Sequence, residues 1–464
     1  MRVLPAYAPR QGGAVDGAGP GLPRPSPAAP GVGGLGEPGT LLLAGPPVGT
    51  SGGGLDGHLR TWGALPAVDG AGVRALLRAS ALDGRGGGGF LLARKVETAR
   101  FAGGHPVLIV NASESEPVSR KDRTLCAERP HLVLDGAVLV AAALGADEVV
   151  VHLHRAPGSP APVLKSAIAE RRHRGLVDPA WRISTGPDRY VSGESSAVAA
   201  FVDGGEARPR FGTRPLAVEG PSGRPTVVSN AETVAHLAIV ARIGPDVWSS
   251  RGTPSSPGPR LVTVTGAVRR PGRVLELAGP VTIGDILTAD GPLAPPAAVL
   301  VGGFAGSWVA GDQAWPTPFS RDALRTHDAE PGCGLLAVLP HGACGLVETA
   351  RIVRYLAGES AGQCGTCVEG LPRLAGAFEA LADGSLRRRG ARRMHALGDR
   401  TLGSGACGHP DGVVRLIRSA LTVFEDDVVG HLAGHPCRGS VHPPVFTVPG
   451  TDLAVGRADP REWV

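Results

Sequence analysis

Apolar residues in the first half of the chain form two short runs separated by one long run. Residues 107–110 and 149–153 are rich in β-branched residues and predict buried strands, and residues 132–144 between them predict a helix. Two such strands joined through a helix indicate a β-α-β unit with a parallel sheet. Ligands of parallel sheets usually bind beyond the carboxyl ends of the strands. Polar residues that follow these runs are therefore the first candidates for a binding site.

The pattern changes after a segment rich in Ser, Gly and Pro at residues 249–259, which predicts a linker between domains. Residues 261–268 and 274–277 predict two strands, and Pro271 with Gly272 between them predicts a type II turn. Thr282, with Asp285 three residues later, predicts the start of a short helix. We expect a small sheet with one helix in this part of the chain.

The last third of the chain has apolar residues at helical spacing. Three such stripes are present: Leu346, Ala350, Val353 and Leu356; then Leu371, Leu374, Ala375, Phe378 and Leu381; then Val413, Leu416, Ile417, Ala420, Leu421 and Phe424. We interpret them as core faces of a helical bundle. Residues 1–65, in contrast, are rich in Pro and Gly and show no sustained period, which predicts a mostly irregular segment outside the functional site.

The composition is that of a globular protein and excludes several classes. Among 464 residues, 47 basic side chains stand against 42 acidic ones, a surplus too small to indicate a nucleic-acid partner. No stretch reaches the roughly 18 uncharged residues of a membrane-spanning helix, and no apolar signal segment opens the chain. The 7 cysteines are odd in number and cluster late, which fits ligand or redox duty in a reducing compartment. We expect a cytoplasmic protein.

A glycine-rich segment, GRGGGGF at residues 84–90, is followed by Lys95. Glycines allow several main-chain N–H groups to converge on an anion, and a lysine adds a positive charge for a phosphate. Because the chain has 70 glycines, a plain flexible loop is an equally good interpretation. Lys95 is more informative, since only three lysines, Lys95, Lys121 and Lys165, stand among 47 basic residues.

Three further polar motifs are candidates for ligand contacts. They are NASESEP at residues 111–117 with KDR at 121–123, YVSGESS at 190–196, and GRPTVVSNAET at 223–233. The first follows a predicted strand directly, at the position where a parallel sheet presents its ligand contacts. Taken alone, each motif could also be a solvated turn.

Cys364 and Cys367 form a CxxC pair, and Cys407 follows them between predicted helices. Two thiolates at this spacing can bind one face of a metal site or cluster, and a third from a distant helix can close around it. An iron–sulfur cluster, zinc, a redox-active dithiol and simple buried cysteines all remain open. Cys126 and Cys333 fit buried structural positions better.

In this order, the five motifs resemble the flavin-binding, NADH-oxidising F subunit (51 kDa subunit) of bacterial complex I. The segments that carry the resemblance are GRGGGGFLLARK, NASESEPVSRKDR, GESS, GRPTVVSNAET and ESAGQCGTC, with GACGHP around Cys407, and they cover about residues 62–435. The resemblance implies α/β plus α+β architecture: a Rossmann-like FMN domain (62–248), a ubiquitin-like β-grasp domain of the SLBB type (260–335) and a C-terminal helical bundle with an iron–sulfur site (336–437). Residues 1–61 and 438–464 would flank these domains.

The resemblance also implies a function and a set of site residues. Electrons would pass from NADH through FMN to an iron–sulfur cluster, in a peripheral protein that meets a ferredoxin-like protein or other complex I-type subunits. Glu116 would lie at the reacting side of the nicotinamide, together with Phe90. The cofactor-binding residues would be Gly84, Arg85, Gly86, Gly87, Phe90, Lys95, Asn111, Glu114, Tyr190, Gly193, Glu194 and Asn230, and the cluster ligands would be Cys364, Cys367 and Cys407.

The chain departs from the family pattern at both redox sites. Ala361 stands where the family has its first cluster cysteine, so the cluster is either 4Fe-4S with water, Ser360 or His409 on one iron, or incomplete. Cys344, Cys437 and His435 are more remote candidates. Thr98 and Pro215 replace aromatic residues of the nicotinamide side. A second hypothesis is therefore a paralogue that lost NADH oxidation or the cluster and acts as a ferredoxin-coupled carrier or a non-catalytic binding module.

Overall fold

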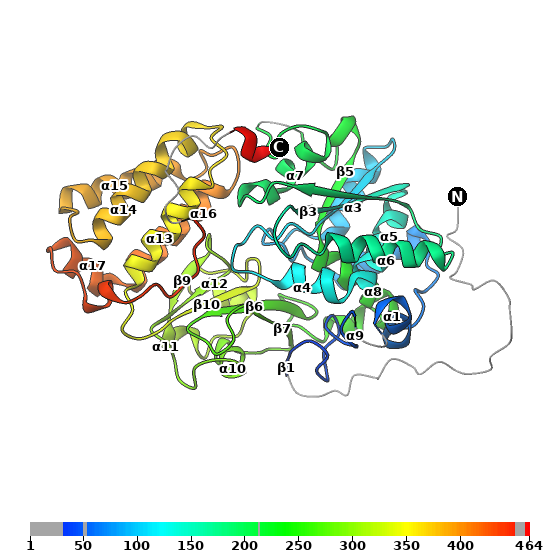
Figure 1. Ribbon diagram of the computed structural model, residues 1–464, viewed down its shortest axis with the longest axis horizontal. Coiled ribbons are helices and arrows are strands. Elements are labelled where there is room, and N and C mark those ends of the chain that lie inside the picture. The colour runs from blue at the N-terminus through cyan, green and yellow to red at the C-terminus, as the bar shows by residue number, and fades with distance from the viewer. Residues whose placement is uncertain (1–30, 50–52, 212–213, 451–459) are drawn as a thin grey trace.

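The computed structural model describes residues 31–49, 53–211, 214–450 and 460–464 and has a mixed α/β fold (Figure 1). Three parts lie around a common centre: a parallel sheet covered by helices, a second sheet, and a group of C-terminal helices coloured yellow to red. None of the described helices is long and apolar enough to cross a membrane. The first 30 residues of the predicted irregular segment lie outside the described residues.

The first sheet is parallel and has the strand order β4-β3-β2-β5. Its strands are β2 (Val107–Asn111), β3 (Glu148–His154), β4 (Ala180–Gly186) and β5 (Thr226–Asn230), and the long helix α5 (Pro130–Leu144) precedes β3. The predicted strand-helix-strand unit is thus confirmed. Asn111 and Asn230 are direct partners at the carboxyl ends of neighbouring strands, so the polar segments that follow them start at the same edge.

Helices cover both faces of this sheet. Leu108, Val110 and Val227 belong to one large core with α5 and α8 (Ala231–Ile243), while the alternate residues Val107 and Ile109 pack with α7 (Ser195–Val202). This alternation explains why residues 107–110 of β2 are apolar throughout, because this strand is buried on both sides, whereas the edge strand β4 is partly exposed. The other helices of this part are α1 (Gly54–Trp62), α2 (Gly70–Ser80), α3 (Leu92–Phe101), α4 (Lys121–Glu128), α6 (Ala161–His173) and α9 (Pro245–Ser249).

The second sheet is mixed and has the order β1-β7-β6-β10-β8-β9. Its strands are β1 (Gly31–Gly33), β6 (Arg260–Gly266), β7 (Arg273–Ala278), β8 (Ala298–Val301), β9 (Ser307–Ala310) and β10 (Leu335–Leu339), and only β6 and β10 run parallel. The predicted turn is confirmed, because Arg273 N–H donates to the Arg270 carbonyl at 3.1 Å and Gly272 has φ +86°. Helix α10 (Ile283–Thr288) begins with the predicted capping box of Thr282 and Asp285. Two short helices, α11 (Gly311–Ala314) and α12 (Arg321–Arg325), complete this part.

The C-terminal helices pack against one face of the mixed sheet. They are α13 (Gly345–Gly358), α14 (Leu371–Ala382), α15 (Arg388–Thr401), α16 (His409–Val423) and α17 (Glu425–Leu432). Leu300, Trp308 and Ala337 of the sheet share a core with them, whereas Val299, Val301 and Val309 point to the opposite face, toward α10. The three predicted helical stripes are confirmed as buried, except that Leu421 is partly exposed.

Three expectations about the boundaries are wrong. Within residues 31–61, β1 pairs with β7, and α1 buries Leu55, His58 and Trp62 at helical spacing. A scan for apolar periodicity misses this helix because its central buried residue is a histidine. The expected boundary after residue 335 falls inside strand β10, and the expected tail contributes Phe446 and Trp463 to buried clusters.

Candidate functional site

One cavity of about 600 Å³ lies at the carboxyl edge of the parallel sheet and is lined by all three parts of the chain. Its volume lies in the usual range for small-molecule sites. The predicted residues that line it are Gly84, Gly86, Gly87, Phe90, Lys95, Asn111, Glu114, Glu116, Tyr190, Gly193, Glu194, Asn230 and Cys407. Segments as distant as residues 84–95, 190–195 and 407–409 therefore line one cavity.

The glycine-rich segment forms a tight loop between Asp83 and Leu91, which pair in an isolated β-bridge. Gly84 N–H donates to the Phe90 carbonyl at 2.9 Å, and Gly87 has φ +100°, a conformation that other residues rarely adopt. Because these glycines have no side chains, their main chain forms the cavity wall. The Phe90 ring at the end of the loop is 70% exposed.

Lys95, on α3, reaches across to β5, where its Nζ donates to the Val228 carbonyl at 3.1 Å. Burial lowers the pKa of this ammonium group, and the Phe90 ring lies 6.0 Å from Nζ. The ammonium group has three N–H donors and uses one for this carbonyl, so the other two can bind a ligand in the cavity.

Two predicted acidic residues use their carboxylates to begin helices. Glu194 is the N-cap of α7 and accepts from the Ser196 and Ala197 N–H groups at 2.8 and 3.1 Å. Glu114 accepts from the Asp122 and Arg123 N–H groups at 3.1 and 3.0 Å, at the start of α4. Both side chains line the cavity, but both oxygens of Glu114 and Oε2 of Glu194 already have partners in the protein.

Arg85 differs from its neighbours and does not line the cavity. Its side chain is fully buried, 3.1 Å from Asp83 and with a hydrogen bond of 2.6 Å to the Pro257 carbonyl. Its main-chain N–H donates to Thr233 Oγ1. The predicted cofactor contact of the Arg85 side chain is therefore not supported by this position, since the guanidinium is directed into the packing between the loop and residue 257.

Glu116 lines the cavity and has a strongly raised pKa. Burial raises its pKa to about 8, although the Phe304 N–H and the Tyr190 hydroxyl, at 2.9 and 3.4 Å from Oε2, oppose the shift. The other oxygen, Oε1, is buried and has no hydrogen-bond partner among the described residues, and the same holds for Ser113 Oγ. Glu116 thus holds a proton near neutral pH in the wall of the cavity.

The cysteines of the CxxC motif lie beside Cys407. Cys367, in a π-helical turn at Thr366–Gly370, is within hydrogen-bonding reach of the Cys364 and Ser360 side chains and interacts with Cys407. Burial alone would raise the pKa of Cys364, but N–H groups of residues 366, 367 and 406 that donate to its sulfur bring it below the ordinary value. Of the three, only Cys407 also lines the cavity, together with His409.

Ala361 lies in an apolar cluster with Val191 and Trp463, against which Cys407 packs. Its methyl group has no donor atom for iron. His409 donates from Nε2 to the Leu356 carbonyl at 2.8 Å, which leaves Nδ1 buried and without a partner among the described residues.

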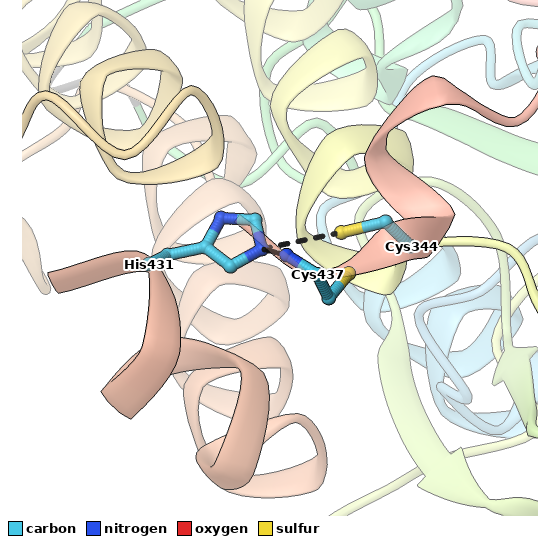
Figure 2. A group of neighbouring side chains, drawn as sticks. All are labelled: Cys344, His431 and Cys437. Atoms are coloured by element: carbon cyan, nitrogen blue, oxygen red, sulfur yellow. Dashed lines mark hydrogen bonds between the residues drawn. The ribbon is translucent and has the colours of Figure 1, made fainter. Parts of the chain in front are cut away.

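The remote candidates Cys344 and Cys437 are elsewhere. Figure 2 shows them beside His431, at the end of α17, in a separate group of potential ligands. His435 is exposed and does not belong to this group. The sequence analysis overlooked His431, because its distance of 87 residues from Cys344 gives no local signal.

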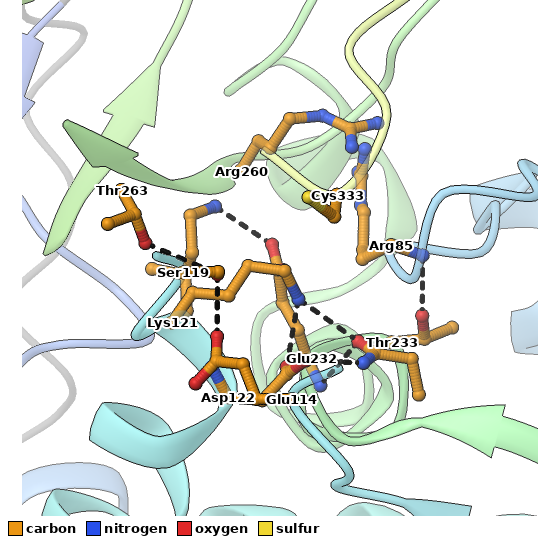
Figure 3. Close-up of polar contacts among 12 residues, drawn as sticks. Arg85, Glu114, Ser119, Lys121, Asp122, Glu232, Thr233, Arg260, Thr263 and Cys333 are labelled. Carbon is orange, nitrogen blue, oxygen red and sulfur yellow. Dashed lines mark hydrogen bonds and ion pairs between the residues drawn. The ribbon is translucent and has the colours of Figure 1, made fainter. Parts of the chain in front are cut away.

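A buried network of charges supports the cavity floor (Figure 3). Lys121 Nζ lies 2.8 Å from Asp122 and 2.9 Å from Glu232, and Asn230 donates to Asp122 at 2.8 Å. Burial alone would lower the pKa of Lys121, but the two carboxylates raise it above its ordinary value. Sequence analysis identified Lys121 and included Glu232 in the GRPTVVSNAET motif, but it did not pair the two residues.

Two family models match the chain. Residues 77–239 match the Nuo51 FMN-binding domain, and residues 348–431 match the NADH-ubiquinone oxidoreductase-F iron-sulfur binding region. The first covers the glycine-rich loop and the parallel sheet, and the second covers the cysteine motif and α13–α17.

Curated relatives are similar to the chain over most of its length. The F subunit of NADH-quinone oxidoreductase from Mycobacterium tuberculosis is 28% identical over 391 residues, which are 79% of this chain and 85% of the relative. The corresponding F subunit from Aquifex aeolicus is 28% identical over 365 residues, 75% of this chain and 83% of the relative.

Two solved structures are also similar to this chain. A chain of the NAD+-reducing [NiFe]-hydrogenase in the H2-reduced state superposes with a TM-score of 0.73 at 29% identity, over 85% of this chain and 68% of that chain. In the air-oxidized state the TM-score is 0.72 at 28% identity, over 83% of this chain and 65% of that chain. The chain thus spans about two thirds of the hydrogenase chain it matches.

Proposed function

Because this chain is a divergent member of the NADH-quinone oxidoreductase F-subunit family, we propose that it passes electrons from NADH through FMN to an iron–sulfur cluster. In this role it is an NADH dehydrogenase-type oxidoreductase component. The observation that carries the proposal is that one cavity is lined both by the glycine-rich loop with Lys95 and by Cys407. A flavin held there would lie next to a thiolate of the cluster, as electron transfer between the two requires.

The cavity fits a flavin nucleotide in size and in chemistry. Main-chain N–H groups of Gly86 and Gly87 and the Lys95 ammonium would hold its phosphate and ribityl groups, with Gly84 in the wall beside them and Asn111 and Asn230 at the same sheet edge. The unpartnered Ser113 Oγ and Glu116 Oε1 are buried polar atoms that such a ligand would satisfy. When bound, FMN can accept the two electrons of a hydride and release them one at a time.

The protein groups contribute binding, orientation and proton control. Lys121, paired with Asp122 and Glu232, fixes Asn230 through the hydrogen bond of Asn230 to Asp122. Glu116 holds its proton near neutral pH, so no second negative charge is placed beside an anionic cofactor.

Three thiols fit an iron–sulfur cluster that lacks one cysteine. Cys364, Cys367 and Cys407 would bind three irons, and main-chain N–H groups around Cys364 favour its thiolate form. Because Ala361 stands at the position of the family's first cluster cysteine, water, Ser360 or His409 would bind the fourth iron, or that iron would be absent. We propose a 4Fe-4S cluster with one non-cysteine ligand, or a three-iron cluster.

The domain division is part of the same proposal. Residues 54–248, which include helix α1, would form the Rossmann-like FMN domain and 260–339 the β-grasp domain of the SLBB type, with strand β10 assigned to the sheet it pairs in. Residues 340–450 would form the helical iron–sulfur domain. The relatives are subunits of larger assemblies, which supports a redox partner protein, either ferredoxin-like or another complex I-type component, in the cytoplasm or at a membrane complex.

Anaerobic purification with FMN and iron analysis tests the proposal. The protein should contain FMN and at least three irons per chain, and NADH should bleach the flavin absorbance. Lys95→Met should weaken FMN binding about tenfold or more, because it removes a buried positive charge, whereas Lys165→Met on the exposed side of α6 should not. Cys364→Ser should lose iron and keep FMN. A protein without extractable FMN would contradict the proposal.

The second candidate is an electron carrier that does not oxidise NADH. Thr98, where the family has an aromatic residue of the nicotinamide side, is exposed and does not line the cavity. Flavin that is reduced by a ferredoxin but not by NADH would favour this function.

A further inference from the structure

A second group of potential metal ligands lies at the other end of α13. Cys344 Sγ, His431 Nε2 and Cys437 Sγ all lie within 4.8 Å of one another (Figure 2). We propose that these three side chains bind one zinc ion, in a site that is separate from the iron–sulfur cysteines and independent of the function proposed above.

The distances suit a single ion. At Zn–S of about 2.3 Å and Zn–N of about 2.0 Å in a tetrahedral site, ligand atoms are about 3.5–3.8 Å apart. The Cys344 sulfur lies 3.9 Å from His431 Nε2, so only small movements would complete the site. Two thiolates and an imidazole are ligands that suit zinc, whereas magnesium and calcium prefer oxygen ligands.

The hydrogen bonds of His431 determine its tautomer. Nδ1 lies 3.1 Å from the Leu381 carbonyl, which can only accept, so Nδ1 carries the proton. Nε2 accepts from the Cys437 N–H at 3.0 Å and therefore has its lone pair directed toward the two cysteines. A carbonyl that orients the distal nitrogen is the usual outer contact of a metal-binding histidine. In the zinc-bound protein, the ion would replace the Cys437 N–H as the partner of the lone pair.

The position in the fold favours a structural role. Cys344 is the N-cap of α13 and is 2% exposed, His431 is fully buried in the last turn of α17, and Cys437 follows in the next loop. One ion would thus join the start of the helical part to its end. Cys437 is only half-buried, and Ser440 Oγ lies 3.7 Å from its sulfur, so this hydroxyl or a water molecule would be the fourth ligand.

The zinc site is far from the cluster cysteines. Cys344 precedes α13 and Ser360 follows it, and a helix of 14 residues is about 21 Å long. Substitution at one site should therefore leave the metal content of the other unchanged.

Metal analysis and zinc-edge X-ray absorption of the full-length protein test the proposal. Protein purified anaerobically from zinc-containing medium should hold about one zinc per chain, with two sulfur neighbours at about 2.3 Å and one nitrogen at about 2.0 Å. Cys344→Ser and His431→Gln should each lower the zinc content at least tenfold without loss of iron. The matched control His395→Gln, an exposed histidine of α15, should keep zinc. Cys364→Ser should lose iron and keep zinc.

Any of three metal analyses would overturn the proposal: no zinc in the native protein, zinc that persists in both ligand variants, or zinc that is lost in Cys364→Ser. A Cys344–Cys437 disulfide in protein alkylated under reducing, anaerobic conditions would also overturn it. If a ligand variant does not fold, the absorption spectrum of the native protein decides, because zinc misplaced at the CxxC motif would have three sulfur neighbours.

Discussion

Single residues in the cavity wall have properties that depend on what surrounds them. Glu116 is a carboxyl group whose pKa is raised to about 8 because burial removes its hydration. Burial also raises the pKa of its neighbour Glu114, but the carboxylate of Glu114 accepts N–H donors from Asp122 and Arg123 at the start of α4. Two acids two residues apart therefore have different contacts: one has an unpartnered oxygen in the cavity wall, and the other begins a helix.

The pH dependence of stability should reveal the proton on Glu116. Its pKa is raised from 4.5 in the unfolded chain to about 8, so its stabilising effect is complete below pH 4.5 and is lost as the pH rises to about 8. The loss is at most about 1.4 kcal/mol for each pH unit of that interval. Glu116→Gln should remove this decline. Denaturant unfolding from pH 5 to about pH 9 measures it, with the exposed Glu219→Gln as control; parallel curves for wild type and Glu116→Gln would disprove the assignment.

At the scale of elements, helices α5 and α8 pack closely together in the core on one face of the parallel sheet. Gly136 of α5 faces the Val234 carbonyl of α8, and a Cβ atom there would lie 1.9 Å from that oxygen. The two helix backbones can approach this closely only because residue 136 has no side chain. Gly376 of α14, in contrast, has open space around its Cβ position.

Opposite effects of the same substitution should follow at these two glycines. Gly136→Ala should destabilise the protein by about 1–3 kcal/mol or more, because the helices must separate. Gly376→Ala should stabilise it by about 0.5–1 kcal/mol through helix propensity. Unfolding in urea measures both. Equal effects would show that α5 and α8 do not constrain each other as described.

At the scale of the whole molecule, the segment at residues 31–43 connects the two sheets. Strand β1 extends the mixed sheet beside β7, and Leu42 and Leu43 enter the core of the parallel sheet. Glu276 of β7 links this segment to the mixed sheet, because its carboxylate accepts hydrogen bonds from the Leu41 and Leu43 N–H groups at 2.9 and 3.0 Å. Burial raises the pKa of Glu276 to about 7.

Removal of this carboxylate should loosen the segment before the rest of the protein. In Glu276→Ala, the main-chain N–H groups of residues 41–43 lose their partner, at a cost of about 1–3 kcal/mol. Hydrogen exchange at residues 31–49 should accelerate about tenfold or more, while exchange in β2 and β3 stays unchanged. If hydrogen exchange accelerated equally in all parts of the protein, or in none, Glu276 would not hold this segment locally. Glu219→Ala is the matched control.

The sequence by itself was sufficient where the signal is local or tied to strand ends. Strands β2 and β3 of the parallel sheet, the Thr282 and Asp285 cap and the helical stripes follow from periodicity and turn chemistry, whereas β4 and β5 were not predicted as strands. The cavity motifs were predictable because the carboxyl ends of parallel strands meet at one edge, as Asn111 and Asn230 do.

Only the tertiary structure decided the features that depend on distant partners. Arg85 turned away from the cavity because Asp83 and the Pro257 carbonyl hold its guanidinium, and burial raised the pKa of Glu116 although Phe304 and Tyr190 donate hydrogen bonds to it. His431 joined Cys344 across 87 residues. Periodicity reports which face of an element is buried, but the identity of the neighbour, which determines charge, proton and metal binding, arises only when the elements pack.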